Sequence, residues 1–150
     1  MSHARQQIRD AAVTELTGLD TSGARVYPSR VYPTGDEHLP GLIVFCGDEK
    51  VVRRGDRRVG MQVRQIDLIV EARAKLAGGV ADLLDTMVAE VEEALAAGVS
   101  VAILSLELAE TTLLMAPLEV PVGVARMKFV VRYAIDRDVP TMPVDMEPAS

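Results

Sequence analysis

Few side chains in this sequence have the types and spacing that catalysis or metal binding requires. The two histidines, His3 and His38, stand in unrelated segments, and neither has a second ligand at metal spacing. No Gly-x-Ser-x-Gly motif, P-loop or Cys-x-x-Cys pair occurs. We therefore expect no catalytic residue, no metal and no cofactor. The carboxylates are numerous but scattered, so a paired-carboxylate hydrolase with partners from distant strands stays open as an alternative.

The cysteine content and hydropathy bear on the compartment. Cys46 is the only cysteine and lies in the apolar run GLIVFCG, where a free thiol behaves as a small buried hydrophobe. This fits a reducing, cytoplasmic setting. The N-terminus lacks the apolar run of a secretory signal, and no segment approaches 18 uninterrupted apolar residues. We expect neither export by that route nor a membrane partner.

Charge is unevenly distributed along a chain whose net charge is −6. Residues 50–64 contain six basic side chains against Asp56 alone, and the segment VVRRGDRRVG reads as two strand ends around a Gly-Asp turn. Three interpretations of this basic turn stay open: a solvated loop, a contact with an acidic protein neighbour, or a phosphate contact. The basic residues that we consider as partner contacts are Arg53, Arg54, Arg57 and Arg58.

Two helices are predicted from apolar spacing. Residues 3–17 form the first, with Ser2 as N-cap and Gly18 as the stop signal. The second follows Gly79 and ends before Gly98. Its apolar stripe at helical spacing comprises Val80, Leu83, Leu84, Met87, Val88, Val91, Ala94 and Leu95. The opposite face is acidic, with Asp82 and Asp85 in its first turns, and is either a solvated face or a docking surface.

Three segments alternate with the period of two that half-buried strands show. In residues 125–135 the odd positions are apolar or aromatic, while Arg126, Lys128 and Arg132 occupy the other face. Residues 65–74 and 104–108 alternate in the same way. Opposed charges predict cross-strand pairs of Arg126 or Arg132 with Asp67 or Glu71.

A chain of 150 residues is long enough for one core, and we expect a domain over residues 1–136 with a flexible Pro-rich tail over 137–150. An eleven-residue strand spans roughly 36 Å, longer than a compact domain of this size, so a β-hairpin should protrude. The predicted fold class is α/β (α+β). It has a mixed, mostly antiparallel sheet of about five strands, with two helices packed on one face.

The order of elements resembles a known family. A short N-terminal helix precedes GARVYPSRVYP, DEHLPGLIVF and Gly47-Asp48-Glu49; QIDLIVEARA, ADLLDTMVAEVEEAL and VGVARMKFVVRYAI follow. This order, over roughly residues 5–136, is similar to the tail-terminator (tail-completion) family of long-tailed bacteriophages, the proteins like minor tail protein U. The basic turn and the Pro-rich C-terminus depart from the family pattern.

The resemblance implies a structural virion protein of the tail or neck, assembled in the cytoplasm of a bacterial host. Family members form a hexameric ring on the finished tail tube, stop its growth and present the surface that joins the head. The implied partners are other copies of the chain, the tail tube protein and a head-completion or connector protein. Passing DNA would cross the lumen without specific binding, because phosphate contacts need cationic side chains and this chain has an excess of acidic ones.

We expect the contacts with these partners to involve the basic turn, the charged face of the last long strand and the acidic helix. The residues so predicted are Arg53, Arg54, Arg57, Arg58, Arg126, Lys128, Arg132, Asp82 and Asp85. Two alternatives remain at this stage. One is another neck component, such as a head-completion or stopper protein. The other is a small enzyme or ligand-binding domain with a cleft beside Asp67, Glu71 and Arg73.

Overall fold

The structure is a computed structural model that describes residues 3–28, 36–54, 61–116, 120, 122–136 and 139–144. It is an α+β fold, as predicted. The helices are α1 (Ala4–Leu16), the 3-10 turn η1 (Asp36–His38) and α2 (Val80–Ala96). The strands are β1 (Val26–Tyr27), β2 (Gly41–Arg54), β3 (Met61–Lys75), β4 (Ser105–Ala116), β5 (Val122–Asp136) and β6 (Val139–Val144).

The strands form one sheet in the order β1-β2-β3-β5-β4. Only the short β1 runs parallel to its neighbour among the described strands, so the sheet is mixed and mostly antiparallel, as the alternation indicated. β4 borders β5 along residues 122–132, and β6 borders residues 134–136 of β5. β3 and β5 are both 15 residues long and pair along their whole length.

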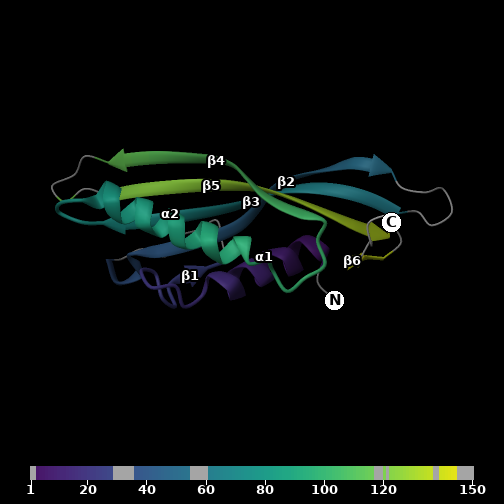
Figure 1. Cartoon of the computed structure of the whole chain (residues 1–150), viewed down its shortest axis with the longest axis horizontal. Coiled ribbons are helices and arrows are strands. Elements are labelled where there is room, and N and C mark those ends of the chain that lie inside the picture. Colours follow the sequence, from purple (N-terminus) through teal and green to yellow (C-terminus); the bar gives the residue numbers. More distant parts are fainter. Residues whose placement is uncertain are drawn as a thin grey trace.

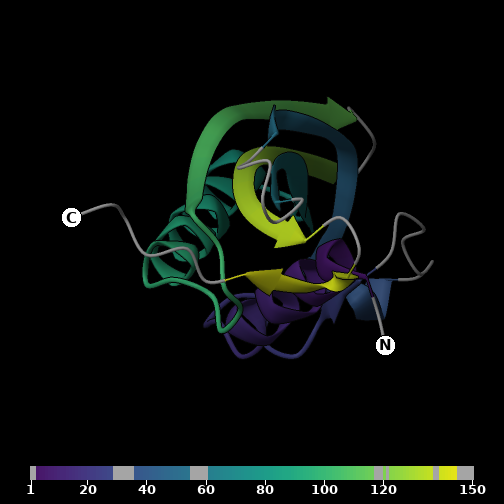
Figure 2. The same ribbon diagram turned by 90° about the vertical axis from the view of Figure 1, so that its right-hand side faces the viewer.

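Both helices cover the same face of the sheet (Figure 1), and the core lies between them and the sheet. The stripe predicted for α2 is confirmed, and its buried members pack over β3 and β5. α1 lies over β2 and touches α2. Alternate residues of β5 from Ala125 to Ile135 face the helices and are buried. The sheet is strongly twisted and curls over its length, as Figure 2 shows.

The ends of α1 differ slightly from the sequence prediction. The helix begins at Ala4, and its N-cap is His3 rather than Ser2, because the imidazole Nδ1 accepts a hydrogen bond from the backbone N–H of Arg5 at 3.1 Å. It ends at Leu16, and Gly18 follows with a left-handed φ of 95°. Glycine tolerates that conformation without steric cost, so its role as a stop signal is confirmed.

The β2–β3 hairpin runs past the N-terminal end of α1 (Figure 1), in keeping with the predicted protruding hairpin. Part of the segment expected to be a Pro-rich tail is ordered into the sheet as β6. Prolines are compatible with a strand at a sheet edge, where a missing N–H removes no ladder bond. The domain boundary at residue 136 stays a prediction.

Candidate subunit interfaces

The outer face of the sheet, opposite the helices, carries the three basic residues predicted on β5. Arg126 and Arg132 are exposed and Lys128 is half-buried. Lys128 Nζ lies 3.7 Å from Asp67 Oδ2 on β3, and Arg132 Nε donates to Gln65 Oε1 at 3.1 Å. The structure therefore pairs Asp67 with Lys128 rather than with either arginine that the sequence suggested.

Arg126 lies directly opposite Glu71 in the β3–β5 register, as the charge pattern allowed. Its guanidinium carbon also stands 5.7 Å from the ring centroid of Phe45, a distance at which a cation is attracted by an aromatic face. Glu71 Oε1 is 3.5 Å from Arg73 Nη2 on its own strand. The Arg126–Phe45 contact reaches from β5 across β3 to β2, whereas the Glu71–Arg73 ion pair lies within β3.

A shallow groove of about 470 Å³ crosses this outer face. Its floor is Phe45 and Ile69, and its polar lining includes Asp67, Glu110 and Lys128. The predicted cleft beside Asp67, Glu71 and Arg73 thus includes only Asp67 of those three. The lining mixes charges of both signs with apolar side chains.

The acidic back of α2 is exposed at Asp82 and Asp85, where the predicted face is found. Not all of its acids are available to a partner. Glu90 accepts from the backbone N–H of Thr21 at 2.9 Å and from the Thr21 hydroxyl at 2.6 Å. That carboxylate ties α2 to the loop after α1, so the acids of this face that stay exposed are Asp82, Asp85, Glu92 and Glu93.

The four arginines of the basic turn fall in and beyond the end of β2. Arg53 and Arg54 are its last two residues, opposite Val63 and Gln62 of β3. Arg57 and Arg58 lie outside the described residues. The structure thus separates the predicted contact residues into three places: the outer sheet face, the back of α2 and the β2–β3 hairpin.

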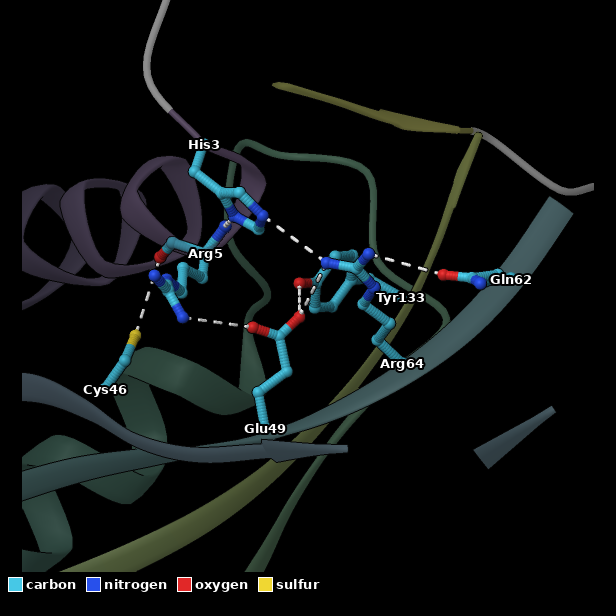
Figure 3. Close-up of polar contacts among 7 residues, drawn as sticks. All are labelled: His3, Arg5, Cys46, Glu49, Gln62, Arg64 and Tyr133. Carbon is cyan, nitrogen blue, oxygen red and sulfur yellow. Dashed lines mark hydrogen bonds and ion pairs between the residues drawn. The ribbon is translucent and has the colours of Figure 1, made fainter. Parts of the chain in front are cut away.

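Sequence reasoning missed a polar cluster under the N-terminal end of α1 (Figure 3). Its centre is the Glu49 carboxylate, which accepts from the Tyr133 hydroxyl and lies 3.4 Å from Arg64 Nη1 and 3.5 Å from Arg5 Nη1. Arg64 also contacts His3 Nε2 at 3.4 Å and donates to Gln62 at 3.3 Å. The cluster therefore fastens α1 to three strands at the base of the hairpin.

Burial sets the protonation behaviour of this cluster. Burial is the largest cause that raises the pKa of Tyr133, and the hydrogen bond to Glu49 raises it further. The phenol therefore stays neutral and donates its proton to that hydrogen bond. Burial also raises the pKa of the nearby Cys46 thiol to about 11, which keeps it a poor nucleophile. The side chain of Cys46 packs against the core, as expected.

A second feature that sequence reasoning missed is β4. The alternation predicted a short strand at residues 104–108, whereas β4 runs from Ser105 to Ala116. A bulge between Leu108 and Glu110 shifts the phase of the alternation, so the period of two breaks off where the strand continues. Every residue of β4 from Glu107 onward is exposed.

The described residues hold no group of three or more histidine, cysteine or carboxylate side chains that could bind a metal ion. Among those same residues, no helix is long and apolar enough to cross a bilayer.

Comparison with known proteins gives a match of fold. No family model matches the chain, and no curated protein matches it. A solved structure described as the virion of a native gene transfer agent particle contains a chain similar to this one, with a TM-score of 0.60 and 20% sequence identity. The alignment covers 87% of this chain and 98% of that one. At this identity the match shows a shared fold.

Proposed function

We propose that this protein is a structural virion component that closes the tail tube of a phage-like particle. In this role six copies form a ring on the last layer of the tube, end its polymerisation and offer the surface to which the head is joined. The observation that carries the proposal is the fold that 87% of this chain shares with 98% of a chain from a gene transfer agent virion. The order of elements that resembles tail terminators supports it independently.

The distribution of charge on the described surfaces suits an assembly subunit. A ring of identical copies needs a heterologous contact, in which two different patches of one subunit meet. Here acidic side chains gather on the back of α2, and basic ones gather toward the end of β2. We assign the hairpin with Arg53, Arg54, Arg57 and Arg58 to contacts with a neighbouring copy or the tube, and the first turns of α2, with Asp82 and Asp85, to contacts with other virion subunits.

Electron microscopy of purified protein mixed with tail tubes of its own phage tests the proposal. Terminated tubes should carry one ring at one end and stop growing when more tube protein is added. Replacing the four hairpin arginines with glutamate should abolish capping while leaving the circular dichroism spectrum unchanged. Filling of head portals instead of tube ends would identify a different neck component and overturn the assignment, and capping by the charge-reversed variant would refute the role of the hairpin.

A further inference from the structure

The described sheet ends in two unlike edges. On one side, β4 pairs with β5 and has no described strand beyond it. On the other side, β1 pairs only with Leu42 and Ile43 of β2, so the stretch Asp48–Arg54 borders β3 alone among the described strands. A strand in this position presents backbone N–H and C=O groups that a strand of another chain can pair with.

The β4 edge is built to be covered. Leu108, Leu113, Leu114 and Met115 are between 39% and 58% exposed, and they project from both faces of the strand. Proteins that keep an edge free protect it with charged side chains, with proline or with β-bulges. β4 has a bulge between Leu108 and Glu110, but its second half, residues 111–116, contains no charged residue and no proline. The charged side chains of β4 are Glu107 and Glu110 only.

The β2 edge complements the β4 edge, because from Lys50 to Val52 it exposes apolar and basic side chains where β4 exposes apolar and acidic ones. Val51 and Val52 are 45% and 39% exposed, and Lys50 beside them is exposed as well. The last five residues of β2, Lys50–Arg54, are basic or apolar. A contact between the two edges would therefore bury apolar side chains on both strands and bring opposite charges together.

The sheet register places the charges on the same face. Lys50 aligns with Gln65, which aligns with Arg132 on the outer face. Glu107 aligns with Val130 and Glu110 with Lys128, two residues of β5 on that same outer face. When sheets are joined edge to edge around one axis, outer faces stay outward, so Lys50 of one copy and these glutamates of the next lie on the same side.

Strand direction agrees as well. The neighbours β2, β3, β5 and β4 alternate in direction, so β4 runs opposite to β2. A rotation axis inclined to the strands, as in a closed barrel, preserves strand direction and staggers the two edges along the strands. Without a stagger Lys50 would lie level with Ser105, and a stagger of two residues brings Glu107 to the level of Lys50. The β4 of one copy then meets the β2 of the next as an antiparallel pair. Strand direction therefore continues to alternate from one copy to the next.

We propose that β4 of one copy adds as an antiparallel strand to the Asp48–Arg54 edge of β2 in the next copy, with Glu107 and Glu110 facing Lys50. The partner is a second copy of this chain. This inference rests on the proposed ring and names the surfaces that close it. The contact is heterologous, and it shares Glu110 with the groove of the outer sheet face.

Cysteine cross-linking tests the contact. In a Cys46→Ser background, Lys50→Cys and Glu110→Cys are introduced singly and together, and each protein is treated with a short bismaleimide. The double variant should give a ladder of covalent oligomers that ends at the closed ring, and both single variants should stay monomeric. Dimers of the Glu110→Cys single variant would reveal β4 pairing with itself and would overturn the proposal. So would the absence of any ladder from the folded double variant at its highest soluble concentration, with tail tubes added or not.

Charge reversal gives an independent measurement that needs no cysteine. Glu107→Lys/Glu110→Lys should weaken association at least tenfold in sedimentation experiments, and adding Lys50→Glu should recover most of it. The matched control Glu92→Lys/Glu93→Lys changes the charge equally on the exposed side of α2 and should associate like wild type. Equal weakening by both pairs would refute the edge contact. Cross-linked rings that fail to cap tubes would leave the contact standing and overturn only the proposed function.

Discussion

The imidazole of His3 lies between two hydrogen-bond donors, and this position makes α1 sensitive to acid. Nδ1 is 3.1 Å from the backbone nitrogen of Arg5, and Nε2 is 3.4 Å from the Arg64 guanidinium. A neutral imidazole can accept one of these bonds, whereas an imidazolium accepts none. Burial lowers the pKa of His3, Arg5 and Arg64 act in the same direction, and Glu49 opposes them.

Because the folded state lowers this pKa, it binds fewer protons at His3 than the unfolded state does. Stability is therefore complete above the ordinary value of 6.5 and falls as the pH drops below it. We predict that His3→Asn, which caps a helix without titrating, reduces the fall in Tm between about pH 7 and about pH 5. The control His38→Asn removes the other histidine and should keep the wild-type fall. Identical pH profiles for all three proteins would contradict this role of His3.

At the scale of elements, the approach of α2 to β5 depends on the absence of a side chain at Gly123. A Cβ at this position would stand 2.5 Å from Leu84 Cδ1 and 2.9 Å from Met115 Sδ. Leu84 is fully buried, so it has little room to move aside. Gly123 thus sets how closely the helix rests on the sheet.

We predict that Gly123→Ala lowers the free energy of unfolding by about 1–3 kcal/mol, the usual cost of overpacking a core. Urea unfolding measures the change. The matched control is Gly78→Ala, because a Cβ at Gly78 would meet nothing within 4 Å, and its φ is not positive. That variant should unfold like wild type or slightly later. A Gly123 variant as stable as the control would mean that α2 can shift outward at no cost.

Elements with an unbroken period were predictable from sequence, whereas contacts between distant segments were not. The stripe of α2 and the alternation of β5 appear in local spacing because each element has one buried face. The β4 strand was predicted too short, since its bulge shifts the phase after Leu108. The Glu49 cluster gave no local signal, because Arg64 and Tyr133 reach it from other strands. The faces of β5 and α2 were predicted correctly, and Arg126 lies opposite Glu71 as the charges suggested, whereas Asp67 pairs with Lys128 and not with an arginine.

For the molecule as a whole, the balance of charge limits its interaction with DNA. The net charge is −6, and two of the cations on the described outer face lie beside carboxylates. Lys128 lies 3.7 Å from Asp67, and Arg73 lies 3.5 Å from Glu71. DNA affinity comes largely from cations that replace counterions on phosphates, so cations already matched by carboxylates contribute little.

We predict no retention of a DNA duplex in a gel-shift assay at about 0.15 M salt, the ionic strength at which surface charges are screened beyond about 8 Å. The double variant Asp67→Asn/Glu71→Gln removes the acids beside Lys128 and Arg73 without changing side-chain size. It should bind DNA weakly. The binding should be sensitive to salt, because log K falls with log salt in proportion to the number of phosphates contacted. The control Glu92→Gln/Glu93→Gln makes the same change in net charge on α2 and should leave DNA unbound. If both pairs bound DNA equally, net charge alone would govern the interaction. Tight binding by wild type would mean that a ring of this protein holds the DNA that it is proposed to let pass.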